Sequence, residues 1–146
     1  MKTITRILTA AVLVALTGSV FAAATVKAGP RKGRILEIEN QQAEFFIEKD
    51  RTISIAFYDA AMKPQPAAAQ VVTATAEAPT GKVKLEFDKK GDLLVSRTPL
   101  PEGKDYTIVV QVKATADAKP KNFRILLDLA ECGECHNPEY ACTCEH

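Results

Sequence analysis

The stretch that decides the fold reads Lys82-Val83-Lys84-Leu85-Glu86-Phe87-Asp88. Charged and apolar side chains alternate along it without a break. In an extended strand successive side chains point to opposite faces, so the three apolar residues share one face and the charged residues share the other. The segment therefore predicts a β-strand with one side toward a hydrophobic core and one side toward water.

The same alternation recurs in seven further segments. Residues 106–114 place Tyr106, Ile108, Val110 and Val112 on one face, and residues 52–59 place Ile53, Ile55 and Phe57 on one face, opposite Thr52, Ser54 and Tyr58. The full set of expected strands is 33–39, 43–48, 52–59, 70–75, 82–88, 92–97, 106–114 and 122–128. Short strands at this regular spacing, without a helical pattern, predict an all-β fold: an antiparallel immunoglobulin-like β-sandwich of seven to eight strands.

Turn residues fall between the expected strands. Lys89-Lys90-Gly91 predicts a three-residue hairpin loop, with glycine where a left-handed conformation is needed. Six prolines lie outside the alternating runs, as expected for loops, because proline cannot donate a hydrogen bond within a sheet. The Ala-rich segment 60–69 contains two of these prolines and is expected to be a loop.

The first 24 residues are typical of a secretory signal peptide. Lys2 and Arg6 precede an uncharged, mostly apolar run from Ile7 to Phe21, and small residues follow it. The apolar run is shorter than the roughly 18 to 20 residues of a membrane-spanning helix. We therefore expect cleavage after Ala22 or Ala24, no membrane span after removal of the leader, and a periplasmic or secreted protein.

Loss of the leader removes two of the 19 basic residues and none of the 18 acidic ones, which leaves 17 against 18 and a net charge near minus one. Nearly neutral charge gives no electrostatic reason to expect a nucleic-acid partner. The remaining length suits one domain with its own core. We divide the chain into a signal peptide (1–24), a β-sandwich domain (25–130) and a tail (131–146).

All four cysteines and both histidines of the chain lie in this tail. Cys-x-x-Cys and Cys-x-Cys pairs can turn two thiolates toward one ion with little loop-closure cost, and Asn137-Pro138 predicts a turn that brings the pairs together. Four thiolates suit tetrahedral Zn(II), and the same soft donors suit Cu(I). The candidate metal ligands are Cys132, Cys135, Cys142 and Cys144, with His136 and His146 as alternates.

Two other interpretations of the tail remain open. An exported chain meets an oxidising environment, and four cysteines permit three disulfide connectivities. Bridges such as Cys132 to Cys144 with Cys135 to Cys142 would staple the tail into a disulfide clasp on a non-catalytic envelope or interaction domain. Alternatively, the Cys-x-x-Cys-His motif that ends at His136 matches the signature for covalent attachment of haem c at Cys132 and Cys135. A β-rich body and the short remainder after His136 argue against haem.

Catalysis finds little support in the sequence. No histidine lies outside the tail to act as a base. Acidic pairs such as Glu37 and Glu39 occupy alternate strand positions and are interpreted as a solvated face. We therefore expect a protein that is not an enzyme.

Three segments carry a resemblance to a known family: Gly33-Arg34-Ile35-Leu36-Glu37-Ile38-Glu39, Ala43-Glu44-Phe45-Phe46-Ile47 and Ile53-Ser54-Ile55-Ala56-Phe57-Tyr58-Asp59. Together they resemble the small β-sandwich module found with periplasmic adaptor subunits of heavy-metal efflux pumps. The resemblance implies an exported domain associated with metal handling, whose partners would be a metal ion and a periplasmic efflux or envelope protein. We expect the tail to bind Zn or Cu in metal homeostasis or efflux.

Overall fold

The computed structural model describes residues 25–144, so the expected signal peptide and His146 lie outside the described residues. Every expected strand segment forms a strand, and the all-β antiparallel fold is confirmed. The strands are β1 (Arg34–Ile38), β2 (Gln41–Ile47), β3 (Ile53–Asp59), β4 (Pro64–Gln65), β5 (Val71–Ala78), β6 (Gly81–Lys90), β7 (Leu93–Ser96), β8 (Thr107–Lys113) and β9 (Lys121–Leu126). A 3-10 helix, η1 (Glu139–Ala141), lies in the tail.

Two of the expected loops differ from the observed ones. The short strand β4 lies in the Ala-rich segment expected to be a loop, where Pro64 and Gln65 pair with the end of β3. Lys89 and Lys90 belong to β6, so the hairpin loop is Gly91-Asp92 and not three residues long. Gly91 does adopt the left-handed conformation, with φ of 62°. A two-residue loop is favoured because its twist matches the twist of the flanking strands.

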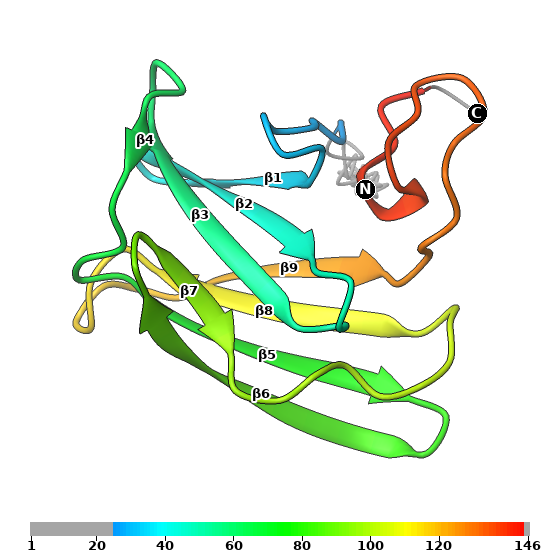
Figure 1. Ribbon diagram of the computed structural model, residues 1–146. Coiled ribbons are helices and arrows are strands. Elements are labelled where there is room, and N and C mark those ends of the chain that lie inside the picture. The colour runs from blue at the N-terminus through cyan, green and yellow to red at the C-terminus, as the bar shows by residue number, and fades with distance from the viewer. Residues whose placement is uncertain (1–24, 145–146) are drawn as a thin grey trace, which may run out of the picture.

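The strands form two layers that are joined through one long strand (Figure 1). The first part of β6 pairs with β5, and residues 87–90 pair with β7, so β6 passes from one layer to the other. The order along the sheet is β1-β2-β3-β7-β6-β5-β8-β9. Strands β5, β6 and β7 are linked by hairpins and β8 returns beside β5, which is a Greek-key arrangement typical of β-sandwiches.

The core fills the space between the layers with the residues that alternation placed inward. On β8, Ile108, Val110 and Val112 are at most 1% exposed, which confirms the expected inward face. Tyr106, just before β8, donates a hydrogen bond of 2.7 Å from its hydroxyl to the carbonyl of Pro101. A tyrosine that bonds back to the chain a few residues upstream is a recurrent corner of immunoglobulin-like sandwiches.

The outer face of β3 is not solvated, contrary to the expected half-buried strand. Ser54 and Tyr58 are buried because the segment before β1 folds over them. The carboxylate of Glu44 is fully buried beneath this segment. It accepts hydrogen bonds from the backbone N–H groups of Arg31 and Gly33, each at 2.8 Å, and from the Tyr58 hydroxyl at 2.7 Å. This buried carboxylate thus fixes the segment to the sheet, and both of its oxygens accept hydrogen bonds.

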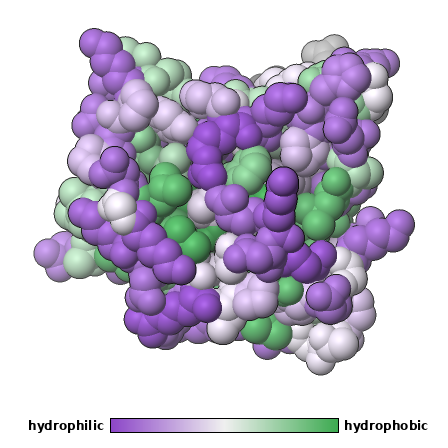
Figure 2. Space-filling view, viewed as in Figure 1, coloured by the Kyte–Doolittle hydropathy of each residue, from purple (hydrophilic) through white to green (hydrophobic). Residues whose placement is uncertain are grey.

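The face turned to the viewer in Figure 2 is mainly hydrophilic, with small separate apolar patches. This view therefore presents no large continuous apolar surface of the kind that marks a protein interface. Within residues 25–144, no helix is long and apolar enough to cross a membrane.

Replacing Glu44 tests the buried anchor. Glu44→Leu removes the acceptor for two backbone N–H groups and for the Tyr58 hydroxyl, so urea denaturation should show a loss of about 3 kcal/mol of unfolding free energy. Glu102→Leu, at an exposed loop position, is the control and should change stability by less than about 0.5 kcal/mol. Equal stability of the two variants would contradict the anchoring role.

Candidate metal centre

The first cysteine pair lies in a tight loop that follows the last strand. Glu131 and Pro138 form an antiparallel bridge, and the N–H of Cys132 donates to the carbonyl of Asn137 at 2.8 Å. The N–H of His136 donates to the carbonyl of Cys132 at 3.0 Å, and His136 has φ of 55°. This left-handed residue reverses the chain directly after the Cys-x-x-Cys pair, so the turn lies just before Asn137-Pro138, where it was predicted, and Pro138 pairs with Glu131.

The second pair is positioned by η1. Proline at position 138 precedes this helix, and Cys142 ends it in an extended conformation. Extended backbone at Cys142 turns its side chain back toward the first pair, and Cys144 follows two residues later on the same side. The N–H of Cys144 lies 3.4 Å from the sulfur of Cys142.

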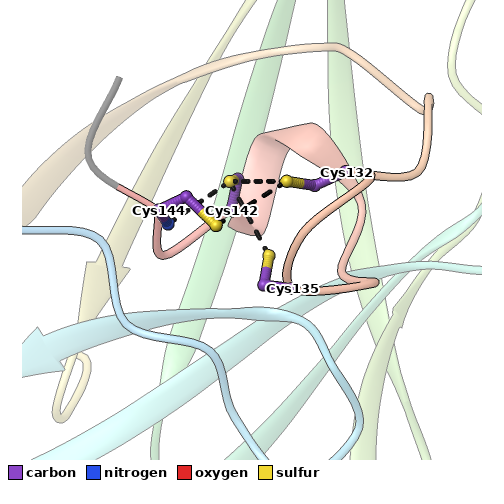
Figure 3. Close-up of side chains that lie close together, drawn as sticks. All are labelled: Cys132, Cys135, Cys142 and Cys144. Carbon is purple, nitrogen blue, oxygen red and sulfur yellow. Dashed lines mark hydrogen bonds between the residues drawn. The ribbon is translucent and has the colours of Figure 1, made fainter.

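The four sulfurs point toward one centre (Figure 3). All lie within 4.8 Å of one another, and three of the Sγ–Sγ distances are 3.3 Å (Cys142 to Cys132), 3.7 Å (Cys135 to Cys142) and 3.8 Å (Cys132 to Cys144). A tetrahedral Zn–S bond of about 2.3 Å requires sulfurs about 3.8 Å apart. None of the cysteines forms a disulfide, in which sulfurs would lie about 2.05 Å apart. The cluster can therefore hold one metal ion.

Hydrogen bonds from backbone N–H groups and burial shift the pKa values of these thiols in opposite directions. The N–H groups of Thr143 and Asn137 lower the pKa of Cys135 to about 6, because they stabilise its thiolate. Burial and then the neighbouring thiol of Cys135 raise the pKa of Cys144. Four thiolates this close repel one another, so full ionisation requires a cation at their centre. Cys135 therefore ionises at a lower pH than Cys144. A cation bound at the centre would displace the protons of the thiols that are still protonated.

The imidazole of His136 lies apart from the four thiols. The Nδ1 atom of His136 lies 2.9 Å from a carboxylate oxygen of Glu131, and both side chains are exposed. His136 is not in the cluster of four ligand atoms. Its backbone carbonyl accepts a hydrogen bond of 3.4 Å from Lys32 in the segment before β1. His146 lies outside the described residues.

Tyr140, between the two ligand pairs, anchors the tail in the core. Its side chain is 3% exposed, and its ring meets Phe45 edge-on with the centroids 5.7 Å apart. Its hydroxyl accepts a hydrogen bond of 3.2 Å from the N–H of Ile47 at the end of β2. Ala141 beside it is fully buried. This anchor was not predicted from the sequence, although the apolar Tyr-Ala pair between the two cysteine pairs was the available signal.

Comparisons with protein-family models, with curated protein sequences and with solved structures found no match. The resemblance to efflux-pump adaptors therefore stays a prediction, and the properties of the site rest on its own geometry.

Replacing Tyr140 separates its hydrogen bond from its packing. Tyr140→Phe leaves the N–H of Ile47 without its acceptor and should cost about 1 to 3 kcal/mol of unfolding free energy. Tyr140→Ala also opens a cavity against Phe45 and should cost about 3 to 5 kcal/mol. Denaturation of both variants, with exposed Thr143→Ala as control, tests this order. If Tyr140→Ala unfolds like the control, the tail is not part of the core.

Proposed function

We propose that this protein is an exported β-sandwich whose tail binds one Zn(II) ion through Cys132, Cys135, Cys142 and Cys144, and that the ion fixes the tail to the domain. The observation that carries the proposal is the set of four converging sulfurs, all within 4.8 Å of one another, with three pairs at 3.3, 3.7 and 3.8 Å. Tetrahedral all-sulfur sites select zinc or iron–sulfur chemistry, and a single ion fits four sulfurs within 4.8 Å.

A structural role follows from the number of ligands. Structural zinc sites are closed by four protein ligands, whereas catalytic zinc keeps one position for water or substrate. With four thiolates the shell is closed, so we propose that the protein is not an enzyme. The buried pair Tyr140 and Ala141 directly precedes Cys142 in the chain, so metal binding and packing of the tail stabilise each other.

Export is the second part of the proposal. The charged start, apolar run and small residues of positions 1–24 support cleavage and delivery to the periplasm or the medium. The mass of the mature chain tests this part, because it should begin at Ala23 or Thr25. An uncleaved chain in the cytoplasm would contradict it.

Zinc content and thiol counting test the metal site. Protein isolated without added metal should carry one zinc per chain, and a chelator should then expose four thiols to a thiol reagent. If the protein contains no metal and its thiols react only after reduction, the tail is a disulfide clasp and not a zinc site. Copper in place of zinc would reassign the ion to Cu(I).

Single substitutions identify the ligands. Cys132→Ser and Cys142→Ser should each lower zinc affinity on the order of 100-fold or more, and should change the thiolate charge-transfer absorption of the cobalt-substituted protein. His136→Gly should retain both the zinc and the spectrum, because glycine accepts the left-handed backbone at this position. Loss of zinc from His136→Gly would show instead that the imidazole is a ligand.

The pH dependence of binding follows from the thiol pKa values. At pH 7 Cys135 is already largely ionised, since its pKa is about 6, whereas the raised pKa of Cys144 keeps that thiol protonated. Zinc binding at pH 7 should thus release fewer than four protons, and affinity should rise with pH as fewer protons compete. Titration calorimetry in two buffers of different ionisation enthalpy counts the protons. Binding without proton release would contradict a thiolate site.

A further inference from the structure

A cavity of about 450 Å³ separates the two terminal strands of the sheet, β1 and β9. We call it the β1–β9 cavity. Its walls include Lys27, Arg34, Ile35, Glu37, Lys121 and Phe123, and no cysteine of the candidate metal centre lines it. The cavity is therefore a second feature, independent of the proposed zinc site.

Arg34 distinguishes this cavity from the rest of the surface. The other four arginines within residues 25–144 each donate to an oxygen of the protein: Arg31, Arg51, Arg97 and Arg124. Among the described residues, Arg34 alone has a guanidinium without a hydrogen-bond or ion-pair partner. It is also partly buried, and this burial lowers the pKa of the guanidinium. A cation that has lost water without gaining an acceptor is stabilised by a bound anion.

Positive charges outnumber negative ones around Arg34. Lys27, Arg34 and Lys121 give three positive charges against one negative charge on Glu37, a local excess of two. Glu37 is already paired with Lys27, and its carboxylate is exposed. The mature chain as a whole is nearly neutral, so this excess belongs to the cavity.

Apolar residues in the wall of the cavity indicate that part of the ligand is apolar. Ile35 and Phe123 line the cavity, and the ammonium of Lys121 lies 5.7 Å from the centroid of the Phe123 ring. Ligand sites in proteins combine mostly apolar walls with a few polar groups that fix orientation. One free guanidinium among apolar walls suits a planar carboxylate attached to an apolar body, because the guanidinium can bond both carboxylate oxygens.

We propose that the β1–β9 cavity binds an organic carboxylate, with the carboxylate on Arg34 and the apolar part of the ligand against Ile35 and Phe123. The carboxylate belongs either to a small organic acid or to the free end of a peptide. Both sources present the same chemistry to Arg34.

Nuclear magnetic resonance titration of the full mature protein with benzoate tests the site. Benzoate should shift the signals of the Arg34 side chain and of the backbone amides of Phe123 and Asn122, which also lines the cavity. The shifts should saturate, and the neutral isostere benzamide should not cause them. A short peptide with a free C-terminus, compared with its amidated form, identifies the source: stronger binding by the peptide acid indicates a chain end, and stronger binding by benzoate indicates a free acid. Both results support the site.

Matched variants complete the test. Arg34→Gln should weaken benzoate binding about tenfold or more, and Lys84→Gln, which removes one exposed charge from β6, should leave it unchanged. Dispersed spectra of both variants establish that they are folded. Absence of saturable shifts would overturn the proposal. Arg34 would then be explained as a charge on an edge strand that prevents pairing with a strand of another molecule. Equal binding of benzamide or of inorganic phosphate would overturn the assignment to an organic carboxylate.

Discussion

The packing of Tyr140 against Phe45 is the contact that makes the tail part of this fold. It places a ring from the tail at the end of the core, and its hydroxyl satisfies the N–H of Ile47 where β2 ends. The two cysteine pairs lie directly on either side of this contact in the chain. Any force that holds the four sulfurs together therefore also holds Tyr140 in place, and the packing of Tyr140 brings the sulfurs to one point.

Local structure alone cannot hold the tail. Within residues 131–144, the only helical element is a 3-10 helix of three residues without a side-chain cap, and short helices of this kind are unstable in isolation. Binding of structural zinc is worth roughly 10 kcal/mol or more in small peptides, which is comparable with the entire stability of an ordinary domain. An ion among the four sulfurs is thus large enough in energy to decide whether the tail is docked. A metal ion at this position would therefore have a structural role.

The features that the sequence predicted are those determined by neighbours in the chain. Alternation over a few residues predicted the strands, and the spacing of the cysteines predicted that both pairs could face one ion. The features it missed depend on distant contacts. The sequence predicted a solvated face at Ser54 and Tyr58, because the segment that buries them lies before β1, and its Arg31 is 23 positions from Ser54. The hydrogen bonds of Glu44 depend on the same segment. Tyr140 reaches Ile47 across 93 positions, which no local pattern encodes.

The coordination shell of the proposed zinc ion tests the central claim most directly. X-ray absorption at the zinc edge of the native protein should show four sulfur neighbours at about 2.3 Å and no shell of nitrogen or oxygen. Three sulfurs with one nitrogen would bring a histidine into the site. A protein without zinc, with its sulfurs paired at about 2.05 Å, would contradict the claim that a metal ion closes the tail onto the core.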